Sequence, residues 1–82
     1  MQIMKSEVRH LLLRDISEVF EVGVALLSDD YRWDASRMDS LAIVSLASHI
    51  HLRFGIFPSA AKIEKCRSVS DIIALVDTLE KV

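Results

Sequence analysis

Apolar residues recur at intervals of three and four along most of the chain, which is the spacing of one face of an α-helix. This spacing predicts a first helix over residues 6–20 with Ser6 as its N-cap, a second over 40–53 ended by Gly55, and a last helix over 69–79. The positions predicted to be buried are Val8, Leu12, Ile16, Val19 and Phe20 in the first helix, Ile43, Leu46, Ala47, Ile50 and Phe54 in the second, and Ile72, Ile73, Val76 and Leu79 in the last.

The helical spacing is lost between residues 21 and 39, although the segment still carries large apolar side chains. We expect an ordered loop in which such side chains act as anchors to the core. Loops of this length are uncommon in compact domains and are often functional, so the residues at its end are candidates for a site. The expected anchors are Val24, Leu26, Leu27 and Trp33.

A short third helical element is predicted over residues 60–65, after Pro58 has interrupted the chain. Ser68 is the predicted N-cap of the last helix, and Asp71 three residues later favours the same start. The chain has only two glycines and one proline, too few for a series of β-hairpins. The 82 residues therefore predict one all-α domain, 1–82, built as a four-helix bundle with a long ordered loop.

Charge and cysteine content exclude several classes of protein. Twelve acidic and ten basic residues give a net charge of −2, so we expect no attraction to nucleic acid or to an anionic membrane. One cysteine, Cys66, cannot form an internal disulfide, and zinc-site spacings are absent. No signal peptide and no membrane-spanning apolar run is recognisable. We therefore expect a cytoplasmic monomer.

The sequence offers little for catalysis. No G-x-S-x-G pattern marks a nucleophile, and two glycines cannot form a phosphate-binding loop. His49 and His51 are two residues apart, which on a helix directs them to different faces, so they are expected to be ordinary polar positions. We predict no catalytic residue and no metal site.

The tripeptide Asp39-Ser40-Leu41 ends the long loop and begins the most apolar helix. A polar residue here can simply cap the helix by accepting a hydrogen bond from a free backbone N–H. Spacing alone favours this interpretation, and a functional role for Ser40 stays open beside it.

Three sequence blocks resemble the acyl carrier protein family. They are Met38-Asp39-Ser40-Leu41, Phe54-Gly55-Ile56 and Val69-Ser70-Asp71-Ile72-Ile73, and their separations match those of the family. The resemblance covers about Ser6 to Leu79. It implies the four-helix fold of that family, with 4′-phosphopantetheine covalently attached to Ser40 and an acyl or aminoacyl group carried on it as a thioester.

The resemblance also implies partner enzymes. A separate phosphopantetheinyl transferase attaches the arm, and Asp39 is its implied contact. A loading enzyme and a downstream transferase then handle the cargo. No His or Lys next to Ser40 in the sequence could activate its hydroxyl, which agrees with modification by an external enzyme.

The second helix departs from the family pattern. No Asp, Glu, Lys or Arg occurs from Ser40 to Leu52, whereas the family commonly has acidic residues there for docking, and Arg37 replaces a common glycine. The outward face is expected to be apolar to weakly polar, unless a small core covers more of this helix. Its residues are Leu41, Val44, Ser48, His51 and Leu52, and these together with Ser45 make up the predicted partner-binding set.

These features predict a specialised carrier that docks a dedicated enzyme through shape and apolar contact. One alternative is a non-covalent helical interaction module, in which Asp39 and Ser40 only cap and the second helix is the binding face. A small enzyme using His49 or His51 is a weaker alternative, because no set of acid, base and metal groups converges.

Overall fold

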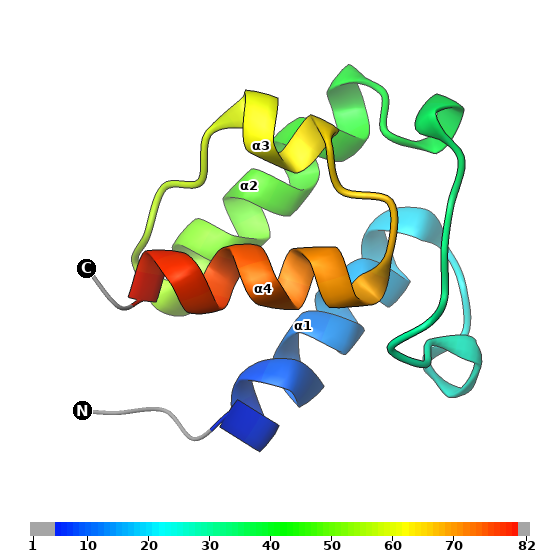
Figure 1. Cartoon of the computed structure of the whole chain (residues 1–82), viewed down its shortest axis with the longest axis horizontal. Helices are drawn as coiled ribbons and strands as arrows, with labels where there is room; N and C mark the ends of the chain where they lie inside the picture. Colours follow the sequence, from blue (N-terminus) through cyan, green and yellow to red (C-terminus); the bar gives the residue numbers. More distant parts are fainter. Residues whose placement is uncertain (1–4, 81–82) are drawn as a thin grey trace.

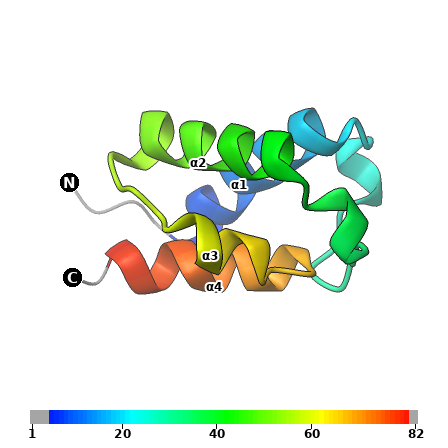
Figure 2. The same ribbon diagram turned by 90° about the horizontal axis from the view of Figure 1, so that it is seen from above.

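The computed structural model describes residues 5–80, which form four α-helices and two short 3₁₀ turns. The helices are α1 (Lys5–Phe20), α2 (Ser40–Phe54), α3 (Ala60–Glu64) and α4 (Val69–Glu80), and the turns are η1 (Val24–Leu26) and η2 (Ala35–Arg37). The all-α prediction is confirmed (Figures 1 and 2). None of the described helices is long and apolar enough to cross a membrane. Residues 1–4, where no signal peptide was expected, lie outside the described residues.

A single apolar cluster joins the helices. Burial of these side chains is the main favourable term in folding such a short chain. Most of the predicted positions are fully buried, and Val19, Ile43, Ala47, Phe54, Ile73 and Leu79 are half-buried. The central members, each at most 1% exposed, are Leu12, Ile16, Leu46, Ile50, Ile63, Val69, Ile72 and Val76.

Helix α1 differs from its prediction at its start and in one buried acid. It begins at Lys5, so Ser6 lies inside the first turn. The prediction that Ser6 is the N-cap is therefore wrong. Asp15 is buried among the apolar side chains, with 1% of its surface exposed. The helix ends at Phe20, and the next residue, Glu21, adopts the left-handed conformation at φ 56° that is usual for glycine after a helix.

Trp33 holds the long loop in place. Its indole Nε1 donates to the carbonyl of Cys66 at 3.0 Å, and its ring lies 4.9 Å from that of Phe20. The backbone N–H of Trp33 donates to Arg67 and that of Val69 donates to Tyr31, both at 3.0 Å. The loop therefore runs beside the link between α3 and α4, as Figure 1 shows.

Two of the predicted loop anchors are wrong. Leu27 and Trp33 are buried, but Val24 is 43% and Leu26 is 67% exposed, because both belong to the 3₁₀ turn η1, which has no buried residue. Met38, which was not predicted, is 4% exposed and anchors the end of the loop. Hydrophobicity identified an anchored loop but not which of its apolar residues turn inward.

Side-chain and glycine caps define the remaining helix ends. Gly55 has φ 72° and donates its N–H to the carbonyl of His51 at 2.8 Å, as expected for the residue that ends α2. The hydroxyl of Ser68 accepts from the N–H of Asp71 at 3.1 Å, so the predicted start of α4 is correct. Ser59 caps α3, a role that was not predicted.

Cys66 lies in the core between α3 and α4, with 5% of its surface exposed. Its thiol donates to the carbonyl of Lys62. Burial, and secondarily the negative charge of Asp71, raises the pKa of the Cys66 thiol from 9.0 to about 11. The nucleophilic thiolate is therefore scarce at neutral pH.

We predict that Cys66 reacts slowly with iodoacetamide in the native protein. A thiol pKa of about 11 instead of 9.0 lowers the thiolate fraction at pH 8 by about a hundredfold, and burial slows access further. The alkylation rate, followed by intact mass, should therefore be at least that much lower in buffer than in concentrated urea. Equal rates in the two solutions would show that Cys66 is accessible.

Candidate functional site: the start of helix α2

Ser40 is the first residue of α2 and is exposed, whereas Asp39 is the residue that caps the helix. The Asp39 carboxylate oxygen Oδ1 accepts a hydrogen bond from the N–H of Ala42 at 2.9 Å. The Ser40 hydroxyl makes no hydrogen bond to another residue of the described 5–80 segment. Of the two interpretations left open by the sequence, the capping role therefore falls to Asp39, and the Ser40 side chain is left available.

Buried neighbours on both sides hold Ser40 in position. Met38 is 4% exposed and Ala42 is 7% exposed, so the chain is tied to the core just before and just after the serine. Figures 1 and 2 both place this end of α2 beside the long loop. The free first-turn N–H groups and the positive end of the helix dipole favour an anionic group here.

The outward face of α2 is largely exposed, as predicted. Leu41 is 75%, Val44 is 61% and Leu52 is 83% exposed, and Ser48 also faces solvent. The alternative left open by the sequence, that the core covers this face, is therefore excluded for these four residues. We call Leu41, Val44, Ser48 and Leu52 the apolar stripe.

Ser45 and His51, the other two predicted partner-binding residues, are half-buried. The His51 ring stacks on Phe57 with 3.8 Å between ring centroids, and its Nδ1 atom is buried without a hydrogen-bond partner within residues 5–80. Phe57 itself is 77% exposed, so it extends the apolar surface beyond Leu52. The sequence prediction missed Phe57, although a phenylalanine just after the glycine that ends a helix is a visible signal.

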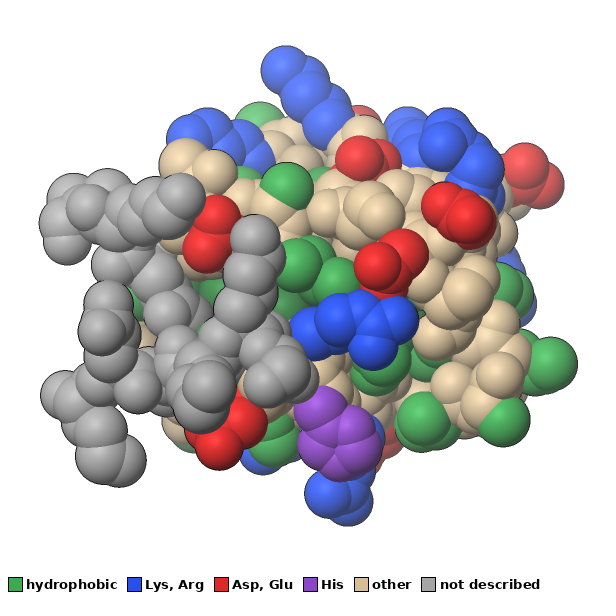
Figure 3. All heavy atoms as spheres, turned by 60° about the horizontal axis from the view of Figure 1, so that its bottom comes forward, with side chains coloured by type: hydrophobic (Ala, Val, Ile, Leu, Met, Phe, Trp, Pro, Cys, Tyr) green, Lys and Arg blue, Asp and Glu red, His purple; other side chains and the backbone are tan. Residues whose placement is uncertain are grey.

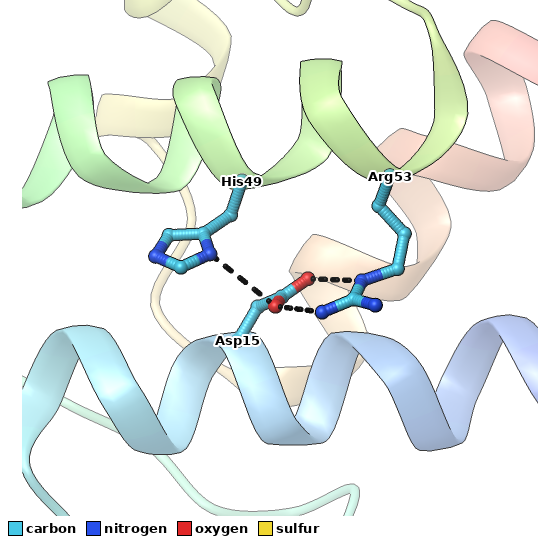
Figure 4. A network of polar contacts seen from close by, with 3 residues as sticks. All are labelled: Asp15, His49 and Arg53. Atoms are coloured by element: carbon cyan, nitrogen blue, oxygen red, sulfur yellow. Dashed lines mark hydrogen bonds and ion pairs between the residues drawn. The ribbon is translucent and has the colours of Figure 1, made fainter.

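A buried carboxylate links α1 to α2. Both oxygens of Asp15 accept from the guanidinium of Arg53, at 2.8 and 3.2 Å, and Asp15 Oδ1 lies 3.3 Å from Nδ1 of His49 (Figure 4). The hydrogen bonds that Arg53 donates to Asp15 raise the pKa of Arg53 further, so the guanidinium stays charged. His49 is thus more than the ordinary polar position that was expected.

The side chains of Asp15, Glu18 and His49 approach one another within 4.8 Å, which is a possible set of metal ligands. The sequence did not predict it because α1 and α2 meet only in the fold. The guanidinium of Arg53 already neutralises Asp15 and holds both of its oxygens. We therefore interpret the cluster as an interhelical ion pair and assign no metal to it.

Ser45, His49 and Asp15 do not form a hydrolytic triad. Ser45 lies one turn before His49 on α2, yet no hydrogen bond joins the two side chains. Both residues lie within the helix, where backbone N–H groups are used by the helix and cannot form an oxyanion hole.

A groove of about 410 Å³ lies between the end of α1 and the first half of α2. The residues on either side of Ser40, Asp39 and Leu41, both line it, and His49 lines it further along α2. Viewed from below relative to Figure 1, the surface carries acidic and basic side chains interspersed (Figure 3). The groove has no counterpart in the sequence pattern, because it is formed by residues of three separate segments.

A family model described as phosphopantetheine attachment site matches residues 10–76. The chain belongs to the phosphopantetheine attachment family. No curated protein and no solved structure matches it. The resemblance drawn from the three sequence blocks is therefore confirmed at the level of the family.

Membership settles the general function of the chain. It is a carrier domain, and its cofactor is 4′-phosphopantetheine bound covalently to a serine. Carrier domains of this family are not catalysts; they interact with phosphopantetheinyl transferases and with enzymes that handle acyl groups. The prediction that the chain is not an enzyme is confirmed on this ground.

We predict that Arg53→Met lowers the free energy of unfolding by about 1–3 kcal/mol, because the Asp15 carboxylate would remain buried without the two hydrogen bonds from Arg53. Urea unfolding measures the change. Arg14→Met, which removes an exposed arginine of α1, is the control and should change it by less than about 0.5 kcal/mol. Replacing Asp15 by Leu in the Arg53→Met variant should restore most of the loss, since no charge is then buried. Equal effects of the two single changes would contradict the structural role of the pair.

Proposed function

We propose that Ser40 is the residue to which the phosphopantetheine arm is attached, and that the chain is a specialised acyl or aminoacyl carrier. The observation that carries this proposal is the exposed Ser40 hydroxyl, which has no hydrogen-bond partner within residues 5–80 because Asp39 alone caps α2. A serine used as the cap would have its oxygen engaged with the backbone. The start of a helix also suits the phosphodiester that attachment creates.

Asp39 is proposed to contact the transferase. Its Oδ1 atom accepts from the N–H of Ala42, which holds the carboxylate at the start of α2, one residue before Ser40. Asp39 is itself exposed, so a basic group of the transferase can reach it. When attached, the arm supplies a terminal thiol that carries the cargo as a thioester. The chain then has only to present Ser40 and to be recognised.

The apolar stripe is the proposed docking face for a dedicated enzyme. Leu41 and Val44 lie within the first turns of α2, close to Ser40, and Leu52 lies near its far end. Three large apolar side chains exposed along one helix face favour a protein partner. Because no charged side chain lies on α2 before Arg53, recognition must come mainly from shape and apolar contact.

The alternative left open by the sequence, a non-covalent interaction module that uses the same apolar stripe, is the weaker one because the family match supports a phosphopantetheine carrier. The exposure of Leu41, Val44 and Leu52 favours it as much as it favours a carrier. Only the arm distinguishes the two, so the deciding measurement is covalent modification.

We predict that coenzyme A and a broad-specificity phosphopantetheinyl transferase add one phosphopantetheine to the protein. The intact mass should rise by that group, and Ser40→Ala should abolish the increase. Ser36→Ala, which alters another exposed serine of the same region, is the matched control and should be modified normally. An unmodified wild-type protein would favour the non-covalent module, and modification of Ser40→Ala would place the arm elsewhere.

We predict that Leu52→Glu lowers kcat/KM of the loading enzyme for the holo-protein by about tenfold, because it places a charge in an apolar contact. Leu26→Glu, a change at another exposed leucine outside α2, should leave it nearly unchanged. Raising the salt to about 0.5 M should alter the wild-type rate by less than about twofold. A steep loss with salt would show that docking depends on charge pairs.

A further inference from the structure

The groove between α1 and α2 begins beside Ser40 and is lined mainly by polar side chains. Glu18 and Glu21 contribute from the end of α1, Arg37 from η2, and Ser45 and His49 from α2. A fatty chain would gain little from such a lining, because apolar surface is stabilised by apolar surroundings. The lining instead suits a chain with amide groups and a polar end.

The length of the groove matches the arm. His49 lies nine residues after Ser40 on α2, which corresponds to roughly 14 Å along the helix axis. The arm beyond its phosphate has about as many backbone bonds as four extended residues, which also span roughly 14 Å. His49 lies on the opposite side of α2 from Ser40, because nine residues make two and a half turns, so the arm would first cross the start of the helix beside Asp39 and Leu41. From there the groove would direct its cargo toward His49.

The near end of the groove offers a cation for the phosphodiester. Arg37 is exposed three residues before Ser40, and its guanidinium lies 5.9 Å from the centre of the Phe20 ring. It forms no ion pair with another residue of the described segment. An arginine in this setting can pair with a phosphate, which offsets the like charge of Asp39.

The far end of the groove offers a carboxylate acceptor for N–H donors. Nδ1 of His49 lies 3.3 Å from Oδ1 of Asp15. Figure 4 shows Nε2 pointing away from Asp15, toward the earlier residues of α2. The Glu18 carboxylate lies within 4.8 Å of His49. Unlike Asp15, Glu18 has no ion pair with another described residue.

We propose that the arm lies in the α1–α2 groove, with its phosphodiester at Arg37, and that the groove favours a short cargo bearing an amino group. The ammonium of an aminoacyl cargo would be held by the Glu18 carboxylate, beside His49. This inference rests on the proposed attachment at Ser40. A second hollow of about 400 Å³, between α3 and α4 beside Ala74 and Leu75, has no lining residue from α2 and is the competing place for a fatty cargo.

The test uses holo-protein whose modification is first verified by intact mass. Three stable cargo analogues are attached to the arm: alanyl, N-acetylalanyl and octanoyl. Amide and imidazole ¹⁵N shifts are then compared with those of the unloaded holo-protein. The alanyl cargo should shift the Glu18 and His49 signals, including His49 Nε2, at least about twice as much as N-acetylalanyl, which lacks the ammonium.

Variants separate the roles of the two ends. Glu18→Gln should reduce the alanyl-dependent shift of His49 about twofold or more, whereas Glu64→Gln, an exposed glutamate of α3, should not. Arg37→Gly should change the ³¹P shift of the phosphodiester in the holo-protein, and Arg32→Gly, an exposed loop arginine, should not.

Distinct results would overturn distinct claims. If no phosphopantetheine is added, the proposed function fails, and this inference fails with it. If holo-protein forms but alanyl and N-acetylalanyl shift the groove signals equally, the amine preference is wrong. If cargo instead shifts the signals of Ala74 and Leu75, the arm does not lie in the groove, although Ser40 still carries it.

Discussion

The side chain of Trp33 joins three segments that are far apart in the sequence. Its ring packs on Phe20 at the end of α1, and its Nε1 donates to the carbonyl of Cys66 between α3 and α4. These contacts hold the long loop in one conformation. They offset the conformational entropy that is lost when any loop is ordered. The position of Met38, and with it that of Ser40 at the start of α2, follows from a loop held in this way.

The buried pair of Asp15 and Arg53 shows where the charge of the second helix is used. No Asp or Glu lies on α2, and its Arg53 turns toward α1 instead of toward a partner. Burying Asp15 is tolerable only because donors from α2 satisfy both oxygens. The pair therefore specifies how α1 and α2 align, and it leaves the outward face of α2 to apolar side chains.

The protein separates its own thiol from the one it is proposed to carry. Cys66 is buried, and its pKa is raised to about 11, so it competes poorly for a thioester at neutral pH. The arm's thiol would be the reactive one. In the proposed arrangement, the groove beside Ser40, with Glu18 and His49 at its far end, would surround that arm with polar side chains.

The sequence by itself determined the helices and their caps at Ser68 and Gly55, because these depend on local spacing and backbone preference. Asp39-Ser40-Leu41 became a candidate site only through the resemblance to a family, because local spacing favoured a simple cap there. The sequence also indicated the apolar stripe of α2, because the residues opposite the predicted buried face of a helix are expected to be exposed. It could not show that Asp15 is buried or that Val24 and Leu26 are exposed, because local pattern does not report which surfaces meet. Only the tertiary structure decided that Asp39, not Ser40, accepts the capping hydrogen bond, and that Asp15, His49 and Arg53 converge. The groove arises in the same way, from packing between segments that the sequence keeps apart.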